Sequence, residues 1–466
     1  MSSHSKIPLI SIIGTTGVGK SQLSIHLASK FNGEIINADS MQMYQKIPQI
    51  TNKHPIEERN GVIHHVMDHV SWDEEYFIHR FKKEALSAIE DIHSRGKIPI
   101  IVGGTHYYLQ SLLFTNKTIE TSSNDLMGDL VNDNNTEDRL TDVEKSILNG
   151  PVDLILKELK KLDPVISEKF HPNDHRRIRR ALEICYATKK PASDIYNSQK
   201  KTEVDESSLR FNTLFFWLFS KPNSLDERLD ARVDKMMDLG AIDELHELYQ
   251  YYLQQGSDVE LDRGVWQVIG FKEFLPYLTK NPDILSKNKN EVLNNLEFKE
   301  CLDEMKLKTR RYARRQVKWI KTLLVPELAN ESKHEWINGG KVFVLDATNL
   351  TQWNEQVGER GEVICENFLN GELNASSSSL KQVPESLSDE KLGFVDPNKN
   401  FDQSKWKHYT CDVCLGKDFK PLVLVGDQYQ DHLNSRKHRN ALRKKDRGNA
   451  RDEWIAKKAK QEAAEQ

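Results

Sequence analysis

The sequence lacks the marks of a membrane, secreted or disulfide-stabilised protein. It has no run of about 18 or more apolar residues, so we expect no membrane-spanning helix and no membrane partner. Six residues precede the first strand-like run, too few for a signal peptide or an Arg-rich transit peptide. Cysteine is scarce, and its odd number and wide spacing indicate a reducing compartment: Cys185, Cys301, Cys365, Cys411 and Cys414.

The sequence also lacks a large excess of charge of either sign. The formal net charge is −4 over 466 residues, so any basic surface for nucleic acid must be local. The length is enough for two or three domains around one large core. We expect a cytoplasmic monomer. The basic run from Arg436 to Arg447 is typical of a nuclear signal and leaves a nuclear pool open, and import into mitochondria without a leader stays open as well.

One motif is complete, a G-x-x-x-x-G-K-[ST] phosphate loop. It follows the apolar run 8–13 and leads into a helical pattern, which is the context that gives the motif meaning. Loop amides and the start of a helix attract an anion, Lys20 adds a positive charge, and Ser21 is placed to bind Mg²⁺. The sequence therefore predicts a site for a ligand with two or more phosphates, formed by Gly14, Thr15, Thr16, Gly17, Val18, Gly19, Lys20 and Ser21.

Strand-like and helical patterns alternate along the first part of the chain. This alternation predicts an α/β fold with a parallel sheet, resembling P-loop NTPases, and a ligand site at the carboxyl ends of the strands. We expect strands at 7–13, 34–37, 98–102 and 213–219, and long helices at 225–255 and 295–324. The predicted parts are the first part of the core (1–115), a helical insertion (116–205) with a polar, acidic segment at 120–145, the core completion with basic helices (206–350), a flexible linker (370–405), a small metal-binding unit (406–447) and a charged tail (448–466).

Two further strand ends carry polar residues that would face the phosphate loop. Asp39 follows the second strand, where it could be a Mg²⁺ ligand, a general base or a helix cap. The third strand ends in Gly103, Gly104 and Thr105, which suit either close approach of a ligand or a tight turn. The local pattern leaves these alternatives open.

Basic side chains gather on three predicted helices. Arg228 and Arg232 are one turn apart and are expected to pair with Asp226 or Asp230. The basic faces of the other two helices either are solvated or contact RNA phosphates. One helix carries Arg176, Arg177, Arg179 and Arg180, and the other carries Arg310, Arg314, Lys318 and Lys321. For His64, His65 and His69 we favour packing or phosphate contacts over a metal site.

The last predicted unit has the ligands of a structural zinc site. Cys411-x₂-Cys414 is followed by His432-x₅-His438, with 17 residues between the pairs, longer than the ~12 of common DNA-reading fingers. Seven Lys or Arg and one Asp lie within 432–447. The sequence therefore predicts a zinc finger, with Zn²⁺ on Cys411, Cys414, His432 and His438, that binds nucleic acid.

Taken together, these blocks resemble the tRNA dimethylallyltransferases (tRNA isopentenyltransferases) of the eukaryotic, yeast type. The resemblance covers roughly residues 7–350 and the finger. It rests on the phosphate loop and on segments 39–44, 64–65, 102–105, 171–177, 225–232, 269–273 and 309–316.

The resemblance implies transfer of a dimethylallyl group from dimethylallyl diphosphate to the exocyclic N6 amine of the adenine 3′ of the anticodon in tRNA. It implies Asp39 as general base, Thr16 and Arg228 as further catalytic residues, and Arg228 beside the loop as a diphosphate ligand with Mg²⁺. The tRNA anticodon stem-loop would meet Asp39, Ser40, Met41, Gln42 and Thr105 at the target adenine, and the basic helices through Arg176, Arg177, Arg179, Arg180, Arg310 and Arg314.

Two other functions remain as alternatives at this level. A phosphate-loop kinase acting on a small metabolite would use ATP and need no tRNA. A non-catalytic zinc-finger RNA-binding protein would not need Asp39, Lys20 and Ser21 intact. The basic helices and the finger disfavour the first alternative, and the intact loop disfavours the second.

Overall fold

The computed structural model describes residues 6–115, 140–172, 174–196, 207–256, 259–284, 289–373, 380–394, 408–415, 421–426 and 428–445. Most of the predicted acidic segment and the whole charged tail lie outside these residues. The chain divides into two compact units: unit 1 comprises Met1–Thr118 and Glu203–Asn398, and unit 2 comprises Ile119–Thr202 and Lys399–Gln466. Among the described residues, no helix combines the length and hydropathy needed to cross a bilayer.

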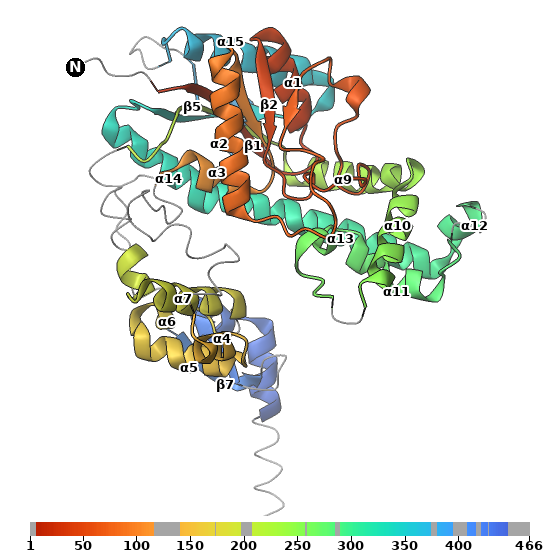
Figure 1. Cartoon of the computed structure of the whole chain (residues 1–466), viewed down its shortest axis with the longest axis vertical. Helices are drawn as coiled ribbons and strands as arrows, with labels where there is room; N and C mark the ends of the chain where they lie inside the picture. The colour runs from red at the N-terminus through yellow and green to blue at the C-terminus, as the bar shows by residue number, and fades with distance from the viewer. Residues whose placement is uncertain are drawn as a thin grey trace, which may run out of the picture. The chain divides into compact units, whose positions relative to one another are not determined.

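Unit 1 is built on a six-stranded sheet with the order β3-β2-β4-β1-β5-β6 (Figure 1). Every pair of neighbouring strands is parallel, which confirms the predicted α/β class. The strands are β1 (Pro8–Gly14), β2 (Gly33–Asn37), β3 (His64–His65), β4 (Ile98–Val102), β5 (Asn212–Phe219) and β6 (Gly339–Asp346).

Both faces of the sheet are buried, as parallel strands require. Alternate residues point to opposite faces, so Ile13 and Trp217 join a cluster with α2 and α3, while Ile12 and Phe216 join a second cluster with α1 and α15. The helices of unit 1 are α1 (Lys20–Lys30), α2 (Ile78–Ser94), α3 (His106–Leu113), α9 (Pro222–Asp238), α10 (Ala241–Gln254), α11 (Phe271–Lys280), α12 (Lys289–Asn294), α13 (Leu296–Trp319), α14 (Val325–Ala329) and α15 (Arg360–Leu369). Short 3₁₀ or π turns are η1 (Ile56–Glu58), η3 (Gly264–Gln267), η5 (Ile320–Leu324), η6 (Asn330–His334), η7 (Leu350–Gln352), η8 (Asn354–Glu359) and η9 (Glu385–Leu387).

The predicted linker at 370–405 is partly wrong. Its Ser-rich stretch indicated a flexible segment, but residues 380–394 pack on unit 1. Leu387 and Leu392 are buried in the core there. Gln382 exchanges hydrogen bonds with β6, since its carbonyl accepts from Val344 N–H at 2.7 Å and its amide donates to Val342 O at 3.2 Å. Two leucines separated by a short turn were enough apolar surface to fix the segment, and composition did not reveal this.

Unit 2 combines the helical insertion with the C-terminal finger (Figure 1). His171 Nε2 lies 2.7 Å from Val423 O, so a residue of the insertion contacts a strand of the finger directly. The insertion has its own core, which includes Leu159, Ile178 and Leu182. The elements are α4 (Asp142–Leu148), α5 (Val152–Leu162), α6 (Pro164–Lys169), α7 (His175–Thr188), β7 (His408–Leu415), β8 (Pro421–Val425) and α16 (Gln428–Leu433).

Candidate active site

The phosphate loop joins the carboxyl end of β1 to the N-terminus of α1, as the motif predicts. Lys20, the first residue of α1, donates from Nζ to the Thr15 carbonyl at 2.6 Å. Burial lowers the pKa of Lys20 to about 8; the Asp39 carboxylate opposes this shift, and the Arg232 guanidinium adds to it. A partly buried cation at a helix N-terminus is the electrostatic signature of an anion site.

Asp39 lies beyond the end of β2, close enough to Lys20 and Arg232 to interact with their charges. Asn37 fixes the turn, because its Oδ1 accepts from Asp39 N–H at 3.1 Å and its Nδ2 donates to Asp39 O at 3.1 Å. The carboxylate accepts from Met41 N–H at 3.1 Å. Burial raises the pKa of Asp39, while the Met41 N–H, Lys20 and Arg232 oppose that rise. A carboxylate held in this way is a stronger base than a solvated one.

Thr105 is brought next to the segment that follows Asp39. Its Oγ1 accepts from Ser40 N–H at 3.0 Å and lies 3.2 Å from Ser40 Oγ. Gln42, by contrast, uses its side-chain amide inside its own loop, donating to Thr51 O at 3.1 Å and to Asn52 O at 3.0 Å. Of the predicted adenine contacts, Asp39, Ser40 and Thr105 therefore form one group, and Gln42 shapes the loop that carries them.

Gln316, a buried residue of α13, links the two strand ends, and sequence reasoning missed it. Its Oε1 accepts from Thr16 N–H at 2.9 Å, and its Nε2 donates to Gly104 O at 2.9 Å. A Cβ at Gly104 would overlap the Gln316 amide and lie 3.5 Å from Asp39 Oδ2, so a side chain here would displace Gln316. Gln316 is the last residue of segment 309–316, which carries the family resemblance, but sequence reasoning assigned it no role of its own.

Arg228 and Arg232 have different partners, although they are one turn apart on α9. Arg232 Nη1 donates to Thr16 Oγ1 at 2.9 Å. Arg228 Nη2 donates instead to the carbonyls of Ala347 and Thr348, at 3.0 and 3.1 Å, just beyond β6. The predicted pairing of both arginines with Asp226 or Asp230 is wrong, because those carboxylates bind α13. The arginine in contact with the loop is Arg232, and the predicted diphosphate role of Arg228 stays a prediction.

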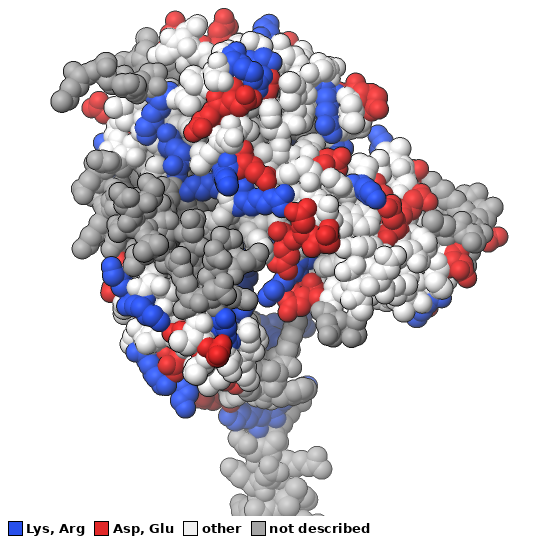
Figure 2. Space-filling model, viewed as in Figure 1, with Lys and Arg blue, Asp and Glu red and all other residues white. Residues whose placement is uncertain are grey.

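The carboxylates of α9 form a ladder of ion pairs with α13. Lys306 Nζ lies 2.6 Å from Asp234 Oδ1, Arg310 pairs with Asp230, and Arg314 pairs with Asp226. Figure 2 likewise shows basic and acidic side chains lying side by side on the face in view. The predicted tRNA contacts Arg310 and Arg314 thus already have carboxylate partners.

The arginines of α7 differ in how far they are engaged within unit 2. Arg177 pairs with Asp174 at 2.6 Å, and its guanidinium lies 5.6 Å from the centre of the Phe170 ring. Arg179 Nε donates to Leu148 O at 3.1 Å. Arg180 pairs with Glu183 at 3.1 Å. Arg176 is exposed. A tRNA contact by these four residues stays a prediction.

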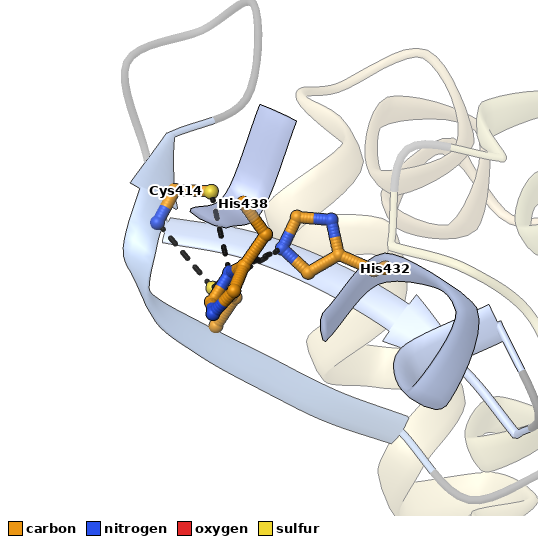
Figure 3. Close-up of side chains that lie close together, drawn as sticks. Cys414, His432 and His438 are labelled. Atoms are coloured by element: carbon orange, nitrogen blue, oxygen red, sulfur yellow. Dashed lines mark hydrogen bonds between the residues drawn. The ribbon is translucent and has the colours of Figure 1, made fainter. Parts of the chain in front are cut away.

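The four predicted zinc ligands converge in unit 2, as Figure 3 shows for Cys414, His432 and His438. The ligand atoms of Cys411, Cys414, His432 and His438 all lie within 4.8 Å of one another, and three of these residues are buried. His438 Nδ1 is 3.1 Å from His432 Nε2 and 3.5 Å from Cys411 Sγ. The edges of a tetrahedral zinc site are ~3.3 Å between nitrogens and ~3.5 Å between nitrogen and sulfur, so this cluster is compatible with zinc.

The three N-terminal histidines are packed or paired instead. His65 Nε2 lies 2.7 Å from Glu34 and His69 Nε2 lies 2.8 Å from Glu84. Burial lowers the pKa of His64 to about 4, and its Nδ1 lies 2.9 Å from Val62 O. In the part of the chain that the structure describes, the only group with metal-ligand geometry is the finger cluster.

Fold and site together define an α/β protein in which a partly buried carboxylate lies beside a phosphate loop. The family profile described as IPP transferase matches residues 42–323. A tRNA dimethylallyltransferase of Saccharomyces cerevisiae is 46% identical over 449 residues, covering 96% of this chain and 94% of the relative. One of Homo sapiens is 31% identical, covering 95% of this chain and 87% of the relative.

A solved structure is also similar to this chain over most of its length. It is described as a eukaryotic dimethylallyltransferase acting on tRNA, and it matches with a TM-score of 0.79 and 44% identity, covering 96% of this chain and all of the other. The chain therefore belongs to the IPP transferase family and, within it, to the tRNA dimethylallyltransferases.

Proposed function

We propose that this protein transfers the dimethylallyl group from dimethylallyl diphosphate to the N6 amine of the adenine 3′ of the anticodon in tRNA, giving isopentenyladenosine. The observation that carries the proposal is the partly buried Asp39 carboxylate, which interacts with the lysine of a phosphate loop whose ligand would be a diphosphate. The names of the relatives, tRNA dimethylallyltransferases from yeast to human, support the same reaction.

The loop side of the crevice suits a diphosphate leaving group. As the carbon–oxygen bond of the allylic substrate breaks, negative charge grows on the bridging oxygen. Loop amides, Lys20 and Arg232 are fixed donors that stabilise this charge without reorganising. Ser21, at the start of α1, offers a hydroxyl for Mg²⁺, which binds oxygen ligands and would share the charge of the diphosphate when present.

The carboxylate side of the crevice suits the acceptor amine. The amine of adenine is barely acidic, so Asp39 cannot remove its proton before reaction. Once the nitrogen–carbon bond begins to form, the nitrogen becomes acidic and its proton passes to the Asp39 carboxylate. The raised pKa of Asp39 favours acceptance of that proton.

Binding of tRNA would use unit 2 together with the basic helices. The adenine has to leave its stack to reach Asp39, and this costs least in a single-stranded loop. Zinc on Cys411, Cys414, His432 and His438 would hold the finger folded, since such small units have little core of their own. The stacked rings of Tyr409 and Tyr429, with centres 4.9 Å apart, are the described part of that core.

The first test replaces the carboxylate of the proposed general base, Asp39, with an amide of the same shape. Asp39→Asn should lower single-turnover prenylation of an unmodified tRNA about 10²–10⁴-fold, because the amide cannot accept the proton. Affinity for tRNA should stay within about 2-fold. Equal losses of turnover and tRNA affinity would show that Asp39 only holds the RNA.

Replacing dimethylallyl diphosphate with ATP distinguishes the proposed transferase from a phosphate-loop kinase. The purified protein is incubated with tRNA and dimethylallyl diphosphate, and in parallel with tRNA and ATP, and nucleosides are analysed by mass spectrometry. We expect isopentenyladenosine in the first mixture only. A nucleotide-dependent product without prenylation would favour a phosphate-loop kinase.

A further inference from the structure

Several buried polar atoms around the phosphate loop have no hydrogen-bond partner among the described residues. They include Thr15 Oγ1, Arg228 Nη1, Arg232 Nε and Trp353 Nε1. A buried donor without a partner costs free energy, so such a group needs an explanation. The set lies around a loop whose backbone is already shaped for an anion.

Trp353 is the member that neither the motif nor the helix pattern predicts. It lies between η7 and η8, and only 8% of its surface is exposed. The edge of the indole that carries the N–H faces the junction of loop and helix. A Cβ on Gly19 would come within 3.1 Å of Trp353 Nε1, whereas the ring carbon Cδ1 would be 3.9 Å away.

The absence of a side chain at Gly19 allows the Trp353 indole to approach the start of α1 this closely. Gly19 is the N-cap of α1 and has φ +94°, a left-handed conformation that side chains rarely adopt. The neighbouring ring of His26, on the same face of α1, meets the indole edge-on with centres 6.3 Å apart. Packing from α1 and from η8, where Gly358 approaches the ring, therefore fixes the indole with its N–H toward the loop.

Arg228 has a second buried donor without a partner among the described residues, and it contacts the segment that leads to Trp353. Its Nη2 is held by the carbonyls of Ala347 and Thr348, which immediately follow β6. Its Nη1 stays buried without a partner. Arg228 and Trp353 are thus both tied to the segment that leaves β6, and both present N–H groups that a polyanion would satisfy.

We propose that the indole N–H of Trp353 donates a hydrogen bond to a phosphate oxygen of the ligand bound at the phosphate loop. With Arg228, Trp353 forms the wall of the diphosphate site on the β6 side. This inference rests on the proposed function for the identity of the ligand. It adds to the site a segment that lies beyond residue 323, where the match to the family profile ends.

The test uses the full-length, zinc-loaded protein with ¹⁵N-labelled tryptophan and inorganic pyrophosphate with Mg²⁺ as the probe. The Trp353 indole N–H resonance, identified by its absence from the spectrum of Trp353→Phe, should move downfield when pyrophosphate binds. Trp217 is the matched internal control, because its indole nitrogen is also buried and unpartnered but lies on the opposite face of the sheet. Its resonance should not move.

The variant gives the quantitative test. Trp353→Phe keeps the aromatic ring and removes the donor, so the Kd for pyrophosphate should rise about 10-fold and the KM for dimethylallyl diphosphate should rise with it. Affinity for tRNA should not change. If the variant does not fold, the wild-type resonance can be assigned through its contact with the His26 ring instead.

The outcomes separate this inference from the proposed function. An unchanged Kd and an unmoved resonance would show that the N–H does not contact the bound ligand, which overturns the inference and leaves the transferase intact. Failure of the wild-type protein to bind either pyrophosphate or dimethylallyl diphosphate, with binding of ATP, would instead overturn the proposed function.

Discussion

At the scale of single residues, protonation of Lys20 makes the charge of the phosphate site depend on pH. Burial has already lowered its pKa to about 8, so the free protein begins to lose the ammonium proton near that pH. A diphosphate binds the protonated form. Above pH 8 the protein must therefore take up a proton on binding, whereas below it the proton is already present.

We predict that affinity for inorganic pyrophosphate falls as pH rises through about 8, by up to 10-fold per pH unit. Isothermal titration calorimetry in two buffers of different ionisation enthalpy would report the proton uptake directly and separate it from titration of pyrophosphate itself. Lys20→Arg is the matched control, because arginine stays charged across this range. The same slope in both proteins would assign the titration to another group.

Asp39, Thr105 and the loop residues could be predicted from the sequence because each follows directly on a strand. Parallel strands end at one edge of the sheet, so three local patterns implied one crevice. Gln316 could not be found in this way. It reaches Thr16 from 300 positions along the chain, and no local pattern carries that information. Trp353 is a similar case, since its relation to Gly19 depends on where β6 and α15 pack.

At the scale of elements, α9 decides which of its arginines meets the loop. Leu229 packs against Gly17, and a Cβ at that glycine would collide with the leucine. With this contact fixed, Arg232 reaches Thr16 and Arg228 reaches the end of β6. The sequence showed two arginines on a helix, but only the docking of that helix on the loop distinguishes them.

Arg228 and Arg232 should differ in their effect on the pKa of the proposed general base, Asp39. The Arg232 guanidinium helps to hold down the pKa of Asp39, whereas burial is what shifts the pKa of Arg228. We predict that Arg232→Gln raises the pKa of Asp39, so that single-turnover prenylation is lost at a higher pH on the acidic side. Arg228→Gln should weaken substrate binding without moving that limb. A pH–rate profile for each variant checks this, and identical shifts would contradict it.

The strands and helices of the fold were only partly predictable from the sequence. The strands at 7–13, 34–37, 98–102 and 213–219 were predicted as apolar runs, and each lies within a residue or so of an observed strand. β6 was not predicted, although Val342, Phe343, Val344 and Leu345 are all buried in it. The predicted helix at 225–255 is two helices, because Gly240, with φ +105°, ends one and begins the next. Tertiary packing supplied what local patterns did not.

At the scale of the whole molecule, the phosphate loop and the predicted zinc ligands belong to separate compact units. The phosphate loop, Asp39 and Trp353 lie in unit 1, while the zinc cluster and the helical insertion lie in unit 2. The insertion and the finger are more than 200 positions apart in the chain, yet His171 meets Val423. The finger is therefore expected to stabilise the insertion as well as itself.

Loss of the metal should consequently act on unit 2 alone. In Cys414→Ala, which removes one ligand, zinc affinity should fall, because structural zinc sites use four ligands. The finger should then unfold, and hydrogen exchange should rise both in residues 408–445 and in the helices α4 to α7, since the insertion loses the strand that His171 contacts. Affinity for tRNA should fall, whereas the Kd for pyrophosphate should not change.

Cys185→Ala provides the matched control, because Cys185 is a buried cysteine of α7 in the same unit that lies outside the zinc cluster. It should leave zinc content and exchange in the finger unchanged. Exchange confined to the finger in Cys414→Ala would mean that the insertion folds without it, and the contact at His171 would then carry no stability. A fall in pyrophosphate affinity would mean instead that the two units are coupled, so that the metal supports the chemistry as well as the binding of RNA.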